Sequence, residues 1–207
     1  MWKAAPAALA VLLLAGCFED RPSDKVAEPV IRKQAETDLV DGLALVDFKR
    51  DNGQVDPNSA NRYKVTYTYR VQLTKPYAEV ILGLASDLHA EWQGNQREPV
   101  SDFDLDALQG SMTLMQNTMA ATQWINAQGD GFIARRDALL GDCQPCLQFW
   151  NSEDAPDQAG HRRTAYILAW SHLEGMQFQD SFTVGDGVDR HAWGYFEKTE
   201  KGWLPSN

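Results

Sequence analysis

Polar and apolar side chains alternate most regularly between Tyr63 and Leu73. The odd positions of this segment carry tyrosine, valine or leucine, and the even positions carry lysine, threonine, arginine or glutamine. Because successive side chains of a strand point to opposite faces, this pattern predicts a strand with one buried and one wetter face, as is typical of antiparallel sheets. Residues 43–49 show a shorter version of the pattern. The two segments are predicted to pair as a hairpin, with a long loop marked by turn-forming residues at 51–53 and 57–58.

The middle of the chain is predicted to be helical. Its apolar residues recur every three or four positions, which places them on one face of a helix, and glycine or proline residues separate the segments. A shorter helix is predicted near the amino terminus, where Pro29 suits a first turn. The predicted helices span residues 29–36, 76–92, 105–125, 132–140 and 159–174.

Strand-like alternation returns near the carboxyl end. Residues 176–184 alternate apolar and polar side chains, although Asp180 interrupts the apolar face, and residues 191–198 form a clearer strand. Gly202 then suits a hairpin turn into a last short strand. Strands followed by helices and again by strands are typical of an α+β fold. We predict one antiparallel sheet of about four or five strands, with the helical middle segment packed on one face.

Length and composition indicate one folded domain. The chain has 207 residues, of which 43% are hydrophobic, 23% charged and 10% aromatic, which is too apolar and too aromatic for a disordered protein. We assign residues 29–207 to a single α+β domain. The formal net charge of −10 repels nucleic acid and anionic lipid headgroups, so no nucleic-acid partner is expected.

The amino terminus has the layout of a bacterial export signal. Lys3 supplies a positive charge, and residues 4–15 form an uncharged run that is too short for the ~20 residues of a spanning helix. Residues 14–17, Leu-Ala-Gly-Cys, end this run and resemble the lipobox of bacterial lipoprotein precursors. An ordinary secretory signal with a coincidental cysteine is the alternative.

The resemblance implies how the chain is processed. In lipoprotein precursors the cysteine thiol receives a diacylglyceryl group and a peptidase cuts before the cysteine, so residues 1–16 are expected to be a signal peptide. Residues 17–28 are then the lipidated Cys17 followed by a polar tether. Two or three acyl chains anchor a protein firmly, because each buried methylene contributes roughly 0.8 kcal/mol. The expected partner at this end is therefore the membrane, bound through the lipid on Cys17.

The residue after the cysteine bears on where the protein is held. Phe18 stands where an aspartate would be the usual inner-membrane retention signal in enteric-type bacteria. By this analogy the protein is expected on the periplasmic side of the envelope, with the outer membrane favoured over the inner membrane.

The segment Cys143-Gln144-Pro145-Cys146 carries intrinsic chemistry. Once Cys17 is lipidated, Cys143 and Cys146 are the remaining cysteines, and the oxidising envelope predicts a disulfide between them. The motif resembles the Cys-x-Pro-Cys active site of thioredoxin-like oxidoreductases, which implies redox activity as an alternative. Two features favour a structural disulfide. The preceding segment is a predicted helix where a thioredoxin unit has a strand, and Asp142 disfavours the neighbouring thiolate.

The remaining candidate residues do not form a catalytic or metal-binding pattern in the sequence. His161 and His172 share a helix face, but three turns separate their Cα atoms by about 16 Å. A zinc site at the cysteine pair needs two further ligands, and the three aspartates within residues 102–106 lack the glycine and glutamate of a calcium loop. We therefore expect no catalytic residue, no metal and no cofactor.

Aromatic and methionine residues offer candidate binding surfaces. Tyr67, Tyr69 and Trp193 are candidates to line a ligand groove, because envelope proteins often stack sugars or peptides on aromatic rings; core packing is the alternative. The methionines at positions 112, 115 and 119 form a helical stripe that is expected to fill the core, with a partner surface as the alternative.

Together these patterns predict a non-enzymatic, membrane-anchored envelope lipoprotein that binds an envelope protein partner or a small ligand. The motivating features are the lipobox, the tether, a domain long enough to bury a core, and a sequence without a convergent catalytic set. The alternative is an envelope thiol oxidoreductase or redox sensor that uses Cys143 and Cys146.

Overall fold

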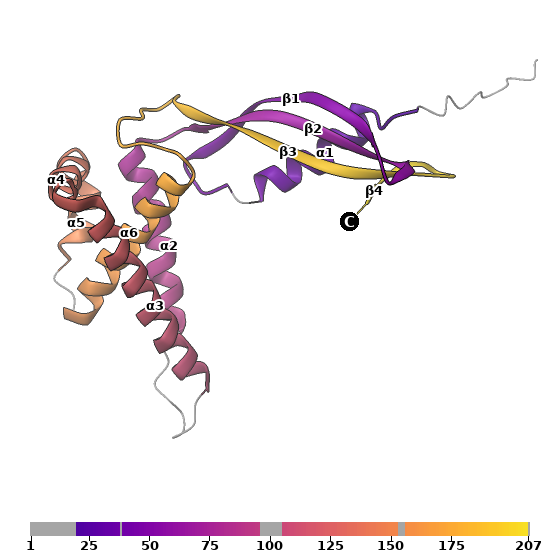
Figure 1. Ribbon diagram of the computed structural model, residues 1–207. Coiled ribbons are helices and arrows are strands. Elements are labelled where there is room, and N and C mark those ends of the chain that lie inside the picture. Colours follow the sequence, from indigo (N-terminus) through magenta and orange to yellow (C-terminus); the bar gives the residue numbers. More distant parts are fainter. Residues whose placement is uncertain (1–19, 38, 96–104, 153–155, 207) are drawn as a thin grey trace, which may run out of the picture.

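Four strands form one antiparallel sheet in the computed structural model, which describes residues 20–37, 39–95, 105–152 and 156–206. The strands lie side by side in the order β1, β2, β3, β4 (Figure 1). Their bounds are Leu43–Asp56 for β1, Ser59–Leu73 for β2, Gly187–Thr199 for β3 and Gly202–Ser206 for β4. The fold is therefore α+β with an antiparallel sheet, as the sequence predicts.

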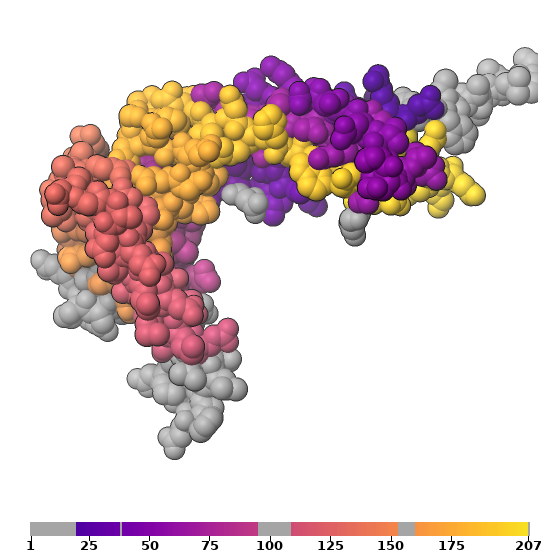
Figure 2. Space-filling view, in the orientation of Figure 1, coloured from indigo at the N-terminus to yellow at the C-terminus, as the bar shows by residue number. Residues whose placement is uncertain are grey.

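The helices lie in two places relative to this sheet. Helix α1 runs along one face of the sheet, whereas α2 to α6 gather at one end of it (Figure 1). We call α1 with β1–β4 the sheet half and α2–α6 the helical half; they meet at an angle that gives the molecule an L shape (Figure 2). The helices are α1 (Asp24–Glu36), α2 (Tyr77–Asn95), α3 (Leu105–Gln128), α4 (Phe132–Gly141), α5 (Gln144–Trp150) and α6 (Pro156–Gly175), with a 3-10 turn at Gly129–Gly131.

The hairpin of β1 and β2 has longer strands and a shorter turn than the sequence predicts. Residues 50–56, expected to lie in a loop, continue β1 along its partner, and the chain turns at residues 57–58. Three register shifts interrupt the pairing, and Asp47 within the first of them has a φ of 53°. Such β-bulges insert extra residues without ending a strand. The turn-forming residues at 51–53 therefore mark a bulged strand and not a loop.

Helix α1 begins earlier than the sequence pattern suggests. It starts at Asp24, after Ser23 at the N-cap position, and Pro29 lies inside the helix instead of in its first turn. Ala27 is fully buried against the sheet. Residues 24–28, which the sequence assigns to the tether, thus belong to the folded domain, and that domain starts before residue 29.

The predicted strand at residues 176–184 is wrong, because this segment is a loop made of turns. Phe178 is buried and packs edge-on against Phe182, with ring centroids 5.9 Å apart. Gln177 has a positive φ of 65°, and the Phe178 amide donates a hydrogen bond to the Leu173 carbonyl near the end of α6. The alternating apolar residues therefore fix a loop to the helical half instead of pairing in the sheet.

Two clusters of buried side chains hold the fold together. The smaller cluster lies between α1 and the sheet, and its buried members are Ala27, Ile31, Val65, Tyr67 and Phe196. A Cβ atom on Gly194 would lie 3.2 Å from Ile31, so this glycine lets α1 approach the sheet closely. The larger cluster fills the helical half and includes Val71 and Leu73 from the end of β2. This shared core joins the two halves.

Candidate functional site

A groove of about 850 Å³ opens on the helical half, between the amino end of α2, one side of α4 and the loop after α6. Its lining is mainly apolar. Ala134 and Ala138 of α4 lie one turn apart and both border the groove, as do Phe182 and Val184 from the loop. We call this cavity the α2–α4 groove. An apolar cavity with a few polar groups is the usual form of a small-molecule site.

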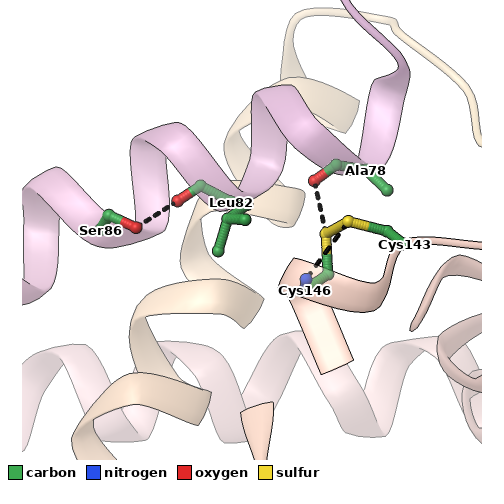
Figure 3. The surroundings of a disulfide bond; sticks show 5 residues. All are labelled: Ala78, Leu82, Ser86, Cys143 and Cys146. Atoms are coloured by element: carbon green, nitrogen blue, oxygen red, sulfur yellow. Dashed lines mark hydrogen bonds between the residues drawn. A yellow bond between two sulfur atoms is a disulfide. The ribbon is translucent and has the colours of Figure 1, made fainter. Parts of the chain in front are cut away.

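A disulfide between Cys143 and Cys146 lies in the wall of the α2–α4 groove. Cys143 is the N-cap residue of α5, where its Sγ atom accepts a hydrogen bond from the Cys146 amide at 3.2 Å. The Cys146 Sγ atom lies 3.3 Å from the carbonyl oxygen of Ala78 in α2 (Figure 3). A disulfide sulfur carries no hydrogen, so this last approach is a packing contact. The disulfide thus closes the first turn of α5, and this turn packs against α2.

The surroundings of the disulfide favour a structural role over thiol exchange. Only 6% of Cys143 and 0% of Cys146 is exposed, whereas exchange requires a thiolate to reach one of the sulfur atoms. The segment that precedes Cys143 is helix α4, as the sequence predicts, and not the strand of a thioredoxin unit. A redox role would therefore require the start of α5 to open.

Arg135 forms a charged cluster at the edge of the groove. Its Nε atom donates to Asp180 at 2.6 Å, and its other guanidinium nitrogens donate to Glu174 and Gln128. The guanidinium carbon lies 4.8 Å from the centre of the Trp170 ring. The hydrogen bond with Asp180, followed by the one with Glu174, raises the pKa of Arg135. Arg135 is thus a fixed cation whose donors are already used inside the protein.

Tyr77 brings a buried hydroxyl group to the same region. The residue lines the groove and is only 3% exposed, and its hydroxyl has no hydrogen-bond partner among the described residues. Burial, with a further contribution from the charge of Asp180, raises the pKa of Tyr77, so the hydroxyl stays protonated. A buried hydroxyl without a partner costs about 1–3 kcal/mol.

The described charged residues that border the groove are mostly acidic. Glu79, Asp142 and Asp180 carry negative charge, and Arg135 is the positive residue among them. Asp180 is neutralised by Arg135, whereas Glu79 and Asp142 are exposed and form no ion pair with other described residues. The mouth of the groove is therefore negatively charged.

Of the three aromatic residues predicted to line a groove, Tyr69 and Trp193 border one cavity, whereas Tyr67 does not. Tyr67 is buried beneath α1, where it stacks on Phe48 and donates a 3.0 Å hydrogen bond to Asp24. Trp193 is paired with a β2 residue of the opposite face, and its ring lies 4.7 Å from the Lys64 ammonium on that face. The sequence pattern identified the strands correctly but did not provide their register.

A second cavity, of about 680 Å³, lies in the corner between the end of α1, the sheet and the end of α6. Tyr69 borders it together with Leu39, Met176 and Arg190. Trp193 also borders it, although its ring lies on the other face of the sheet. Arg190 donates hydrogen bonds to the Met176 carbonyl and to the Gln177 side chain. These bonds connect the sheet to the segment after α6 at the border of the cavity.

Several other predicted features have outcomes in the structure. The methionines at 112, 115 and 119 are exposed on α3, so the expectation that they fill the core is wrong. Both predicted surface histidines, His161 and His172, lie on α6. Among the described residues, no three histidine, cysteine or acidic side chains are placed to hold a metal ion.

Two predicted features fall outside the described part of the chain. Cys17, the expected lipidation site, lies there, as do Asp102 and Asp104 of the incomplete calcium pattern. In the residues that the structure does describe, no helix combines the length and the apolar composition needed to cross a bilayer.

Most residues of the α2–α4 groove are not singled out by the sequence. Tyr77 fits the apolar face of its helix, and Arg135 reads as an ordinary exposed residue of an amphipathic helix. Asp142 is noticeable because it precedes the cysteine pair. These residues come together only in the folded chain, where α2, α4 and residues 180–184 border one groove.

No family model, no curated protein and no solved structure matches this chain. The function is therefore argued from the groove and from the amino-terminal sequence.

Proposed function

We propose that the chain is a lipid-anchored envelope protein whose α+β domain binds a small ligand in the α2–α4 groove and catalyses no reaction. The observation that carries the binding proposal is an apolar groove of about 850 Å³ between α2, α4 and the loop after α6. Its apolar surface is stabilised when a ligand covers it.

The chemistry of the groove supports binding over catalysis. Arg135 is held by Asp180 and Glu174, and the Tyr77 hydroxyl stays protonated at neutral pH. The hydroxyl of Thr183 donates to Asp186 at 2.9 Å, but the hydrogen bonds from the Thr183 amide and hydroxyl lower the pKa of this carboxyl group, which makes it a weak base. Covalent catalysis needs a nucleophile beside a general base, and the described lining residues do not provide such a pair.

The anchoring part of the proposal comes from the amino-terminal sequence. Residues 14–17 resemble a lipobox, and a lipid on Cys17 would hold the domain on the periplasmic side, with the outer membrane favoured. Helix α1 begins at Asp24, so only a short tether separates the anchor from the folded domain. The domain is thereby kept near the membrane surface.

Mass spectrometry of the native protein tests the anchor. The expected mature terminus is Cys17 carrying a diacylglyceryl group, and a Cys17→Ser variant is expected to leave the membrane fraction. A different mature terminus, or an unmodified Cys17 in membrane-bound material, would contradict the proposal.

Isothermal titration with decyl glucoside, a neutral amphiphile used below its micelle concentration, tests the groove. The protein is the mature chain with Cys17→Ser, which needs no detergent. Ala138→Trp places an indole in the groove and is expected to remove saturable binding, whereas Ile133→Trp, at an exposed site on α4 outside the groove, is expected to retain it. Absence of saturable binding to the parent, or equal binding by both variants, would reject the groove as the site.

The thiol oxidoreductase alternative has less support, because both sulfur atoms are buried. An insulin-reduction assay addresses it directly. Robust turnover that Cys143→Ser abolishes would replace the binding proposal with the redox one.

A further inference from the structure

The α2–α4 groove combines apolar walls with a negatively charged mouth. Ala134, Ala138 and Val184 contribute apolar surface, and Val184 is more than half exposed. Glu79 and Asp142 add two carboxylates that form no ion pair with other described residues. A ligand that complements both features needs an apolar body and a positive charge.

Arg135 does not provide a site for an anionic ligand. Its guanidinium donates to two carboxylates and to the Gln128 amide, and its flat face covers the Trp170 ring. An anion at the groove would have to displace these internal partners and would meet the field of a chain with a net charge of −10. The residues at the groove therefore disfavour an acidic ligand.

The ends of the neighbouring helices do not reverse this preference. The amino ends of α2 and α5 carry a partial positive charge and the carboxyl end of α4 a partial negative charge, and all three ends border the groove. Their sum is a partial positive charge of about one half, which is smaller than the charge of the two carboxylates. The sign of the electrostatic potential at the groove is then set by two full negative charges. These belong to Glu79, in the first turn of α2, and to Asp142, directly after α4.

Tyr77 does not add a hydrogen-bonding position to this arrangement. The residue borders the groove and is 3% exposed, and its hydroxyl oxygen is closed off from solvent. The charge preference of the groove therefore depends on Glu79 and Asp142.

We infer that the α2–α4 groove selects a small amphiphilic cation, with an apolar body against α4 and an amine or guanidine group near Glu79 and Asp142. This inference rests on the proposed function, since it assumes that the groove is the ligand site, and it adds the chemical class of the ligand.

The test compares three probes that share one decyl chain: decylammonium, decyl glucoside and decyl sulfate. Each is titrated below its micelle concentration into the mature chain with Cys17→Ser. Decylammonium is expected to bind about tenfold more tightly than decyl glucoside at low salt, because two carboxylates attract it, and decyl sulfate is expected to bind most weakly. Added salt is expected to reduce the preference. Equal affinity for all three, or a preference for decyl sulfate, would overturn the inference.

Two double variants locate the source of the preference. Glu79→Gln with Asp142→Asn is expected to remove the tenfold advantage of decylammonium while decyl glucoside binds as before. Asp51→Asn with Glu200→Gln removes the same charge at exposed positions that do not border the groove, and is expected to keep the advantage. A preference that survives in the first variant would reject the role of the two carboxylates.

The outcomes separate this inference from the proposed function. If decyl glucoside binds the parent and not Ala138→Trp, the groove is the site whatever the charge preference. If decyl glucoside shows no saturable binding to the parent, the groove itself fails and the inference falls with it.

Discussion

The sheet half and the helical half both bury one side of each element, but they present different surfaces to solvent. In the sheet half, α1 covers one face, and the other face carries polar side chains around the half-exposed Trp193. In the helical half, the helices pack around Trp170 and leave the apolar α2–α4 groove open. A polar sheet face is stable in water, whereas an apolar groove is stabilised by a ligand. This difference places the binding proposal on the helical half.

The two halves also differ in what fixes their elements. In the sheet half, Arg50 and Tyr67 each donate a hydrogen bond to Asp24 at the start of α1, at 2.9 and 3.0 Å. In the helical half, a disulfide closes the first turn of α5 where it packs on α2, and Arg135 links α4 to the residues after α6. The helical half therefore combines a local disulfide and ionic contacts with a large core, and the sheet half combines a thin core with two hydrogen bonds to Asp24 at its edge.

The largest effect is expected from Trp170→Ala in the core of the helical half. Trp170 is fully buried, its ring packs against Trp124 and Phe132, and its Nε1 atom donates to Asp180 at 3.0 Å. Removing the ring leaves a cavity and an unpaired acceptor, so the free energy of unfolding should fall by about 3–5 kcal/mol. Urea denaturation of the Cys17→Ser chain measures this loss.

A matched tryptophan in the sheet half is the control for that prediction. Trp193→Ala is expected to cost less than about 1 kcal/mol, because this side chain is 51% exposed. Hydrogen exchange then tests whether the halves unfold together. Since Val71 and Leu73 belong to the core around Trp170, β2 amides should lose protection in Trp170→Ala; full protection there would show two independent units.

The disulfide is expected to have the next largest effect. It closes a loop with a sequence separation of 3, and the loop-entropy relation gives about 2 kcal/mol for so short a loop. Cys143→Ala with Cys146→Ala should therefore destabilise the protein by about 2 kcal/mol, as measured by urea denaturation. Reductant should cost the parent a similar amount and leave the variant unchanged. A parent that loses no stability on reduction would contradict the structural role.

Regular patterns along the sequence predicted the elements of both halves. The alternation in Tyr63–Leu73 identified β2, and the three-to-four spacing identified α2, α3, α4 and α6, because burial of one face imposes these periods, whereas the short helix α5 was not predicted. The period alone misled at residues 176–184, where apolar side chains fix a loop. Residues 50–56 gave the opposite error: a loop was predicted, but these residues belong to β1, because bulges allow turn-forming residues to remain in a strand.

The candidate sites were less predictable, because they depend on long-range register and packing. The pairing of Trp193 with Thr66 places it on the face opposite Tyr67, and a shift of one residue would have reversed this. Arg135 and Asp180 are separated by 45 positions in the chain and meet through the loop after α6. The cysteine pair was recognisable because its disulfide depends on a short sequence separation, which is visible without the fold.

A smaller, pH-dependent effect is expected from Asp24→Asn in the sheet half. The hydrogen bond from Arg50, with a further one from Tyr67, lowers the pKa of Asp24 below the ordinary value of 3.8 for an aspartate. The folded pKa is lower than the unfolded one, so the stabilisation is complete above about pH 5 and is lost as the pH falls through 3.8 and below. Because the carboxylate is 59% exposed and screened by solvent, the variant should lose only about 0.5–1 kcal/mol at pH 7.

Urea denaturation at several pH values checks the sign of this effect. Between about pH 5 and pH 3 the parent should lose more stability than Asp24→Asn, so that the two curves converge. Asp51→Asn, at an exposed position of β1, is the control and should follow the parent. Parallel curves for the parent and Asp24→Asn would show that this contact does not hold α1.

The smallest effect is expected from Met115→Gln on the outer surface of the helical half. Met115 is 57% exposed near the middle of α3, and glutamine has a similar length and helix propensity, so the free energy of unfolding should change by less than about 0.5 kcal/mol. Leu114→Gln, at the half-buried neighbouring position, should cost more, since Leu114 packs against the larger core. Urea denaturation at two protein concentrations distinguishes the explanations of a different result. A larger loss that appears only at high concentration would mean that another chain covers the methionine stripe, and then the helical half would have two apolar surfaces in use, where the sheet half has none.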